Sequence, residues 1–312
     1  MKTLKTISCS VTGYRKQLEG KPCEDATRVI HTKNATVVAV ADGHGDPRCL
    51  FAHIGSQLAV RAACDVLKKY SKRIGKEAPS VFWNSRRSEI AQSVVQNFSR
   101  LAVLDYACRC VDSISADDKK ILINHINREF SKEKEICTPE QIRQQYALKK
   151  RISDRLQSIL YLYGTTLRAS LITDRYMFHM AIGDGDTMIL VDDSVEWVLP
   201  KSEAYECETA SLCESAENVI DNFLFSYIEI YEEKSREYKL DRTGVCPQMI
   251  VLSTDGFRNS FFHEKFFAEK LKDMYVFEQR SDANCVRQIK KLFEKLTRES
   301  IFQDDISAVL CI

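Results

Sequence analysis

Glycine and proline are scarce in this sequence, with 11 Gly and 6 Pro among 312 residues. Such a composition excludes collagen-like chains and disordered chains rich in these two residues. Hydrophobic residues make up 44% and charged residues 29%, which is typical of a soluble globular protein. The length is compatible with two domains or with one large domain. A chain of this size buries about three quarters of its unfolded surface, so it can form a large core without disulfides.

The sequence also lacks an excess of charge of either sign and a long apolar run. Lys and Arg total 45 against 44 Asp and Glu, a formal net charge of +1. This balance gives no support for nucleic acid as a partner, since polyanion binding needs clustered excess base. No segment is long and apolar enough to span a bilayer, and no apolar signal segment follows residues 1–6. We therefore expect a cytoplasmic protein with no membrane partner.

Paired cysteine motifs are absent as well, although the chain has 12 cysteines. Without a C-x-x-C pair a structural zinc site is not favoured, and most thiols are expected to be buried in a reducing compartment. Cys9 to Arg15 and Cys137 to Arg143 have the C-x5-R spacing of cysteine phosphatases. Both lack the preceding His and the glycine-rich anion cradle, and nothing nearby clearly lowers the thiol pKa, so thiol catalysis is not favoured.

The hydrophobic pattern predicts strands, then helices, then strands and helices again. Expected strands are 36–41, 164–173, 176–182, 187–191, 249–253 and 306–312, and the segment before Asp46 is expected to form strands and turns. Expected helices lie within 47–163, one of them starting at Pro139, and at 218–231, 261–274 and 285–298. In the last helix, Val286, Ile289, Leu292, Phe293 and Leu296 form one apolar stripe. Strict βαβ alternation is missing, which favours a sandwich over a doubly wound parallel sheet.

Several apolar runs end in an acidic residue. Asp42, Asp184 and Asp255 each follow such a run and are each followed by Gly, and Asp304 precedes the last strand. An acid beside a buried strand is costly unless it is paired or bound to a cation, and none of these four has an adjacent Lys or Arg. If the strand ends converge, the carboxylates must take up protons or bind a divalent cation. Ligands that are all oxygen select hard ions such as Mg²⁺ or Mn²⁺.

His44 sits in the loop Asp42-Gly43-His44-Gly45, which is too small to bury it. We therefore expect it to transfer a proton, whereas His125 and His179 are interpreted as structural. Other motifs fit less well. The chain has no G-x-x-x-x-G-K-[ST] to accompany a Walker B strand. The segment 184–187 is short by one residue for an aspartyl-nucleophile phosphatase, and its D-x-D is only a loose match to nucleotide-sugar transferases.

Six motifs together, in this order, resemble the metal-dependent type 2C serine/threonine protein phosphatases. They are Glu24-Asp25, Val40-Ala41-Asp42-Gly43-His44-Gly45, Gly164-Thr165-Thr166-Leu167, Ala181-Ile182-Gly183-Asp184-Gly185-Asp186, Ser253-Thr254-Asp255-Gly256-Phe257 and Asp304-Asp305-Ile306-Ser307. The motifs cover nearly the whole chain. The resemblance implies a single domain over residues 1–312 with an α+β fold. That fold is a four-layer α-β-β-α sandwich with two central, mostly antiparallel sheets and a helical segment between the second and third motifs.

The resemblance further implies hydrolysis of phosphoserine and phosphothreonine in proteins, opposing a serine/threonine kinase. Two Mn²⁺ or Mg²⁺ ions would be bridged by Asp42 and by the hydroxide that attacks phosphorus. The other implied ligands are the Gly43 carbonyl, Asp255, Asp304 and Glu24 or Asp25, directly or through water. Asp184 matches the position linked to a weaker third ion. His44 would act as the general acid on the leaving oxygen.

Three departures from the family pattern affect the phosphate-binding side of the site. The family often carries an Arg shortly before its acidic pair, and here Arg15 and Lys21 are the candidates for gripping the substrate phosphate. Asp186 replaces an Arg that is common in the fourth motif, and Asp305 stands where Asn is common. Two alternative functions stay open: a catalytically silent, phosphatase-like sensing module, and a metal-dependent phosphatase of small phosphorylated molecules.

Overall fold

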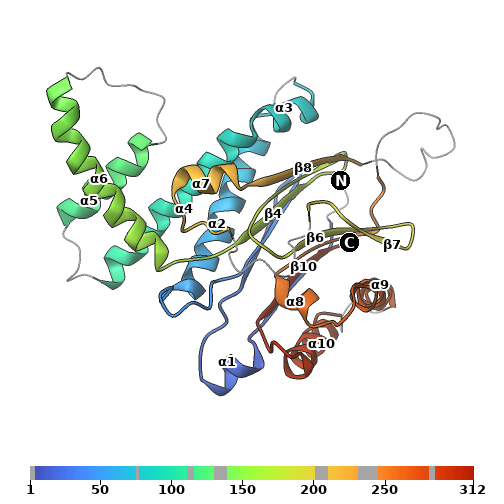
Figure 1. Cartoon of the computed structure of the whole chain (residues 1–312). Helices are drawn as coiled ribbons and strands as arrows, with labels where there is room; N and C mark the ends of the chain where they lie inside the picture. Colours follow the sequence, from blue (N-terminus) through green and yellow to red (C-terminus); the bar gives the residue numbers. More distant parts are fainter. Residues whose placement is uncertain are drawn as a thin grey trace.

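Two sheets packed face to face form the centre of the protein. The structure, a computed structural model, describes residues 4–74, 77–110, 116–129, 139–200, 210–230, 245–280 and 285–312. Within these ranges each sheet has five strands, every neighbouring pair is antiparallel, and helices cover both outer faces (Figure 1). The predicted four-layer α+β sandwich is confirmed.

The strands of each sheet come from distant parts of the chain. In spatial order the first sheet contains β1 (Thr6–Val11), β10 (Ile306–Cys311), β9 (Met249–Ser253), β6 (Asp186–Val191) and β7 (Ser194–Trp197). The second contains β2 (Ala26–His31), β3 (Thr36–Ala41), β4 (Leu167–Ile172), β5 (Tyr176–Ile182) and β8 (Leu224–Glu229). The strands near the two termini, β1 and β10, therefore lie side by side, and β3 lies next to β4 from the middle of the sequence.

The helices divide between the two outer layers. On the second sheet's side lie α2 (Ala52–Ser71), α3 (Pro79–Ser85), α4 (Arg87–Arg109), α5 (Ala116–Glu129), α6 (Pro139–Tyr161) and α7 (Ala216–Asp221). On the first sheet's side lie α1 (Tyr14–Leu18), α8 (Asp255–Asn259), α9 (Glu264–Arg280) and α10 (Cys285–Glu299). Helix α2 packs directly on the second sheet, whereas α5 and α6 contact α4 and extend away from the sheets (Figure 1). No helix in the described ranges combines the length and apolar character needed to cross a bilayer.

The central strands are apolar along their whole length because both of their faces are buried. In β3, Val38 and Val40 point into the core between the sheets, while Val37 and Ala39 point towards the helices on the other face. Ile250 and Leu252 of β9 likewise face the second sheet. These continuous apolar runs are what made the buried strands recognisable in the sequence.

The expected helix over 218–231 is wrong. Helix α7 ends at Asp221, and residues 224–229 form β8, which pairs with β5. In β8, Phe225 and Tyr227 alternate along one face and contact Phe178 and Tyr176 of β5, with ring centroids 5.9 and 5.7 Å apart. Such cross-strand aromatic pairs stabilise a sheet, and their two-residue period is easily read as part of a helical pattern in a short segment.

The apolar stripe predicted for α10 is confirmed except at one position. Ile289 and Phe293 are buried in the core beneath the first sheet, with Leu292 and Leu296 packed against it. Val286, by contrast, is 51% exposed. The helix thus presents a narrower buried face than the sequence suggested.

This difference predicts two unequal losses of stability. Ile289→Ala should lower the free energy of unfolding by about 2–5 kcal/mol, because it leaves a cavity where a 2%-exposed side chain was. Val286→Ala on the same helix should change it by less than about 0.5 kcal/mol. Urea unfolding followed by circular dichroism measures both, and equal losses would contradict the assignment of the buried face.

Candidate metal and catalytic site

Four aspartates at strand ends meet where the two sheets come together. Asp25 and Asp42 flank β2 and β3 of the second sheet. Asp255 follows β9, and Asp304 lies two residues before β10, in the first sheet. The pKa of Asp42 is raised well above its ordinary value, first by burial and then by the negative charges of the other three aspartates. Carboxylates from both sheets therefore share one electrostatic environment.

The same two causes act on the other members of this group. Burial, followed by neighbouring carboxylates, raises the pKa of Asp25 well above its ordinary value. Burial and the charge of Asp184 raise the pKa of Asp255 to about 6. The pKa of Asp304 is also raised, mainly by burial, although Lys16 opposes the shift. Acids with raised pKa values in one small space cannot all stay ionised at low cost unless a cation is bound. The group therefore favours proton uptake or cation binding.

Close backbone packing holds the acids in place. A Cβ on Gly43 would lie 2.7 Å from the carbonyl oxygens of Glu24 and Ala52, and a Cβ on Gly256 would collide with the Asp305 carbonyl oxygen. Only glycine fits at these two positions, and the reason is the close approach of neighbouring backbone. Thr254 adds a side-chain link, since its hydroxyl donates to Asp25 Oδ2 at 2.7 Å.

Asp305 fastens the segment that carries Glu24 to the start of β10. Its side chain is 1% exposed, and its oxygens accept hydrogen bonds from the backbone nitrogens of Gly13 at 2.6 Å and Glu24 at 2.7 Å. Lys16 Nζ donates to Asp305 Oδ2 at 2.8 Å and also lies 2.7 Å from Glu24 Oε2. The segment from 13 to 24 is thus held on the acidic site by one buried carboxylate.

Lys16 lies beside the acids, although the sequence pattern did not point to it. Lys16 is separated from Asp305 by 289 positions, whereas a sequence pattern shows only the basic residues that lie beside an acid along the chain. One signal could have pointed to it. Asp305 replaces an Asn that is common in the resembling family, and the added buried charge needs a counterion.

Arg15 and Lys21, the predicted phosphate-gripping residues, lie on the surface near this segment. Their side chains are 79% and 63% exposed, and both pair with Glu19, at 3.3 and 2.7 Å. The structure does not bring either side chain to the carboxylates described above. Their assignment to substrate phosphate stays a prediction.

His44 lies on the loop between β3 and α2 and is half-buried. Its backbone nitrogen donates to the Gly164 carbonyl at 3.0 Å, and a Cβ on Gly164 would lie 2.7 Å from His44 Cδ2. Burial lowers the pKa of the His44 imidazole, with Asp184 and Asp46 acting in the opposite direction. The ring therefore packs against the backbone at Gly164, and the negative charge of Asp184 acts on it.

A buried charge network supports Asp184. Arg168, 1% exposed, donates through Nε to the Asp184 carbonyl at 3.1 Å and through Nη2 to the Gly183 carbonyl at 3.3 Å. Asp186 accepts from Arg258 Nε at 3.0 Å and from Trp197 Nε1 at 2.9 Å. The acid at 186 is thus neutralised by an Arg from α8, the helix that begins with Asp255.

The donor set fits a hard divalent cation by its chemistry. The side-chain donors are carboxylates, and Asp25 Oδ1 is buried without a hydrogen-bond partner. Oxygen donors of this kind suit Mg²⁺ or Mn²⁺. Among the described residues, no three His, Cys, Asp or Glu side chains are grouped so that they could hold a metal ion as they stand. The acids are therefore electrostatic neighbours that do not form a closed ligand shell.

The thiol and histidine alternatives do not produce a second site within the described residues. Cys9 is buried in β1, where desolvation raises its thiol pKa to about 11, so it is a poor nucleophile. Cys137 lies outside the described residues. His179 is buried in β5 and hydrogen-bonded to Ser170 Oγ at 2.7 Å, which is consistent with a structural role.

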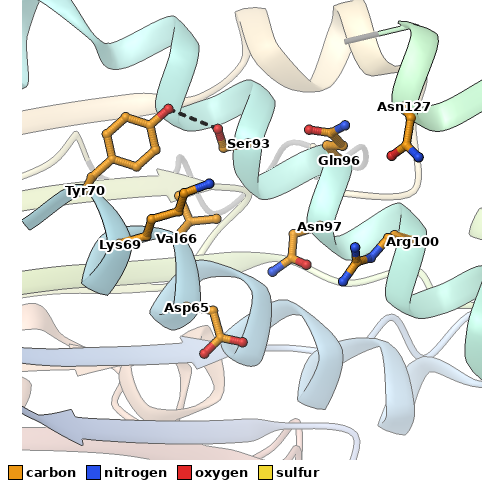
Figure 2. Close-up of a pocket in the computed structure, with 9 residues that line it drawn as sticks. All are labelled: Asp65, Val66, Lys69, Tyr70, Ser93, Gln96, Asn97, Arg100 and Asn127. Atoms are coloured by element: carbon orange, nitrogen blue, oxygen red, sulfur yellow. Dashed lines mark hydrogen bonds between the residues drawn. The ribbon is translucent and has the colours of Figure 1, made fainter. Parts of the chain in front are cut away.

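A polar hollow of about 300 Å³ lies apart from the acids, on the helical layer. It is formed by α2 and α4 with Asn127 of α5 (Figure 2). Its lining residues are Asp65, Val66, Lys69, Tyr70, Ser93, Gln96, Asn97, Arg100 and Asn127. The hydroxyl oxygens of Tyr70 and Ser93 lie 3.1 Å apart at one end. None of the predicted site residues contributes to this hollow.

Solved structures share this fold over nearly the full chain. The serine/threonine phosphatase Stp1 from Staphylococcus aureus aligns with 99% of this chain and 94% of its own, at 11% identity and a TM-score of 0.51. The photosystem II phosphatase PBCP aligns over 99% and 98%, at 13% identity and a TM-score of 0.53. The Mycobacterium tuberculosis serine/threonine phosphatase PstP/Ppp aligns with 99% of this chain and 98% of its own, at 12% identity and a TM-score of 0.50. At these identities the likeness shows the fold alone.

Comparison with curated proteins finds no match. A family model, by contrast, matches residues 12–294, which is most of the chain. The matched range includes five of the six motifs, and the sixth, at 304–307, lies beyond it. The family is described as protein phosphatase 2C, and this chain belongs to it.

Proposed function

We propose that this protein is a metal-dependent phosphatase that hydrolyses phosphoserine and phosphothreonine in proteins. The observation that carries the proposal is the convergence of Asp25, Asp42, Asp255 and Asp304 from two sheets, with Asp25 buried, Asp42 partly buried and the pKa values of both raised. Membership of the protein phosphatase 2C family supports it. So do the names of the structural relatives, two of which are serine/threonine phosphatases.

In this proposal Asp42 is the central ligand of two Mn²⁺ or Mg²⁺ ions. The Gly43 carbonyl, Asp255 and Asp304 would complete the main set, Glu24 or Asp25 would contribute directly or through water, and Asp184 would serve a weaker third ion. Bound cations would supply positive charge for the phosphoryl oxygens and lower the pKa of water. The protein supplies a site in which carboxylates are already desolvated and repel each other, so cation binding relieves a cost present in the metal-free protein.

His44 is proposed to hold the proton that the leaving serine or threonine oxygen needs. Its ring is kept in place by the contact with Gly164, which has no side chain to displace it. An alkoxide is a poor leaving group, and a positioned acid lowers that barrier. Arg168 acts indirectly, because it holds the backbone carbonyls of 183 and 184 and so orients Asp184.

Removal of metal or of its central ligand should abolish activity. EDTA should stop hydrolysis of a phosphothreonine peptide, and Mn²⁺ should restore it. Asp42→Asn should lower kcat by about 10²-fold or more with the far-ultraviolet circular dichroism unchanged, because the neutral amide is a weaker cation ligand. Asp174→Asn, at an exposed turn, is the matched control. Activity of Asp42→Asn equal to that of the parent would refute the metal-dependent reaction.

Hydrolysis rates measured on a panel of phosphopeptides and sugar phosphates separate the substrate classes. Preference for the peptides supports the protein phosphatase. Turnover of the small molecules alone supports the small-molecule alternative, and no turnover of either with Mn²⁺ or Mg²⁺ supports a silent sensing module.

The role of His44 predicts a dependence on the leaving group. His44→Gln should slow hydrolysis of a phosphothreonine peptide by about 10²-fold but that of an aryl phosphate by less than about tenfold, since a phenolate leaves without a proton. His263→Gln, at an exposed position, should leave both rates unchanged. Equal slowing of the two substrates would remove His44 from the general-acid role.

The metal-free protein should become more stable when one buried acid is neutralised. Burial and neighbouring charges raise the pKa of Asp25, so its ionised form destabilises the fold at neutral pH. Asp25→Asn should therefore raise the Tm in EDTA at neutral pH by at least about 2 °C and reduce the further rise caused by Mn²⁺. Asp221→Asn, at an exposed position of α7, is the control. A lower Tm for Asp25→Asn would contradict the repulsive cluster.

A further inference from the structure

Lys16 places a positive charge among the carboxylates proposed to bind metal. Its Nζ lies 2.7 Å from Glu24 Oε2, 2.8 Å from Asp305 Oδ2 and 3.7 Å from Asp304 Oδ1. The side chain is only 19% exposed, although it belongs to the short helix α1 at the surface of the fold. Three acids from two distant segments therefore surround one ammonium group.

The ammonium is held there as a cation. Its Nζ forms short ion pairs with Asp305 and Glu24, and a third carboxylate, that of Asp304, lies beside them. Asp305 is fully engaged as well, because the backbone nitrogens of Gly13 and Glu24 fill its other acceptor positions. Lys16 is thus a fixed counterion whose position is set by the same carboxylate that fastens the 13–24 segment.

We propose that Lys16 is an internal cation that competes with a divalent ion for the Glu24 and Asp304 side of the site and thereby sets its metal affinity. The inference rests on the proposed function, since it assumes that these carboxylates bind metal. A divalent ion that approaches Glu24 must share its carboxylate with the ammonium or displace it. Repulsion between the two positive charges then lowers the affinity of the site.

The buried carboxylate of Asp305 explains why such a cation is present. Asp305 is a buried negative charge, and Lys16 neutralises it at 2.8 Å. With an amide at 305 the lysine would lose its closest fully buried partner. The two residues therefore act as a unit.

Calorimetric titration with Mn²⁺ alone, without substrate, tests the proposal. Lys16→Gln removes the charge but keeps an N–H donor for Asp305, and should bind Mn²⁺ about tenfold more tightly than the parent. Lys16→Arg keeps the charge and should stay within about threefold of the parent. Lys33→Gln, in the exposed turn at the far end of β3 from Asp42, should also leave the affinity unchanged.

Equal or weaker Mn²⁺ binding by Lys16→Gln would overturn the proposal and make Lys16 a support for the ligands instead. If this variant does not fold in EDTA, the Mn²⁺ concentration that restores the folded circular dichroism gives its affinity, and the same comparison applies. If the parent hydrolyses a phosphopeptide with Mn²⁺ but Lys16→Gln binds Mn²⁺ with the affinity of the parent, only this inference is refuted. If the Mn²⁺ affinities of the parent and the variants differ as expected but the parent hydrolyses no substrate, only the proposed function is refuted. No Mn²⁺ binding by any variant would sink both.

Discussion

Mutual repulsion between closely placed carboxylates is the constraint on which the functional end of this protein depends. Asp25 and Asp42 come from one sheet and Asp255 and Asp304 from the other, so the repulsion acts across the sandwich. The core between the sheets, built from residues such as Val38 and Leu252, must hold the two layers together against it. A bound cation would turn the same charges from a source of instability into a link between the layers.

The acids keep their positions because the backbone around them has little freedom. Gly43 and Gly256 lie where neighbouring carbonyl oxygens leave no room for a Cβ. Asp305 adds three polar contacts that tie an N-terminal segment to a C-terminal strand. The site is therefore assembled mainly by tight backbone contacts and buried hydrogen bonds, which are features that resist adjustment when one side chain is changed.

Much of the fold and the group of acids could be predicted because buried strands leave a strong signal. The runs before Asp42 and Asp255 are apolar on both faces, and an acid at their end is conspicuous. Lys16 could not be predicted in the same way, because its partners are assembled only by folding. Strand β8 was not predicted, because its aromatic residues are stabilised by packing against β5, a contact that the local sequence does not show. In each miss the deciding interaction joins residues that are far apart in the sequence.

The buried ion pair between Asp186 and Arg258 has a consequence for how this protein can change during evolution. Asp186 is fully buried and bound to Arg258, and Arg168 is buried close to the same turn. An arginine at 186 would place three guanidinium groups together and remove the carboxylate that pairs with Arg258. A change of charge at 186 alone would therefore leave Arg258 without its partner, so the charges at 186 and 258 are expected to change together during evolution.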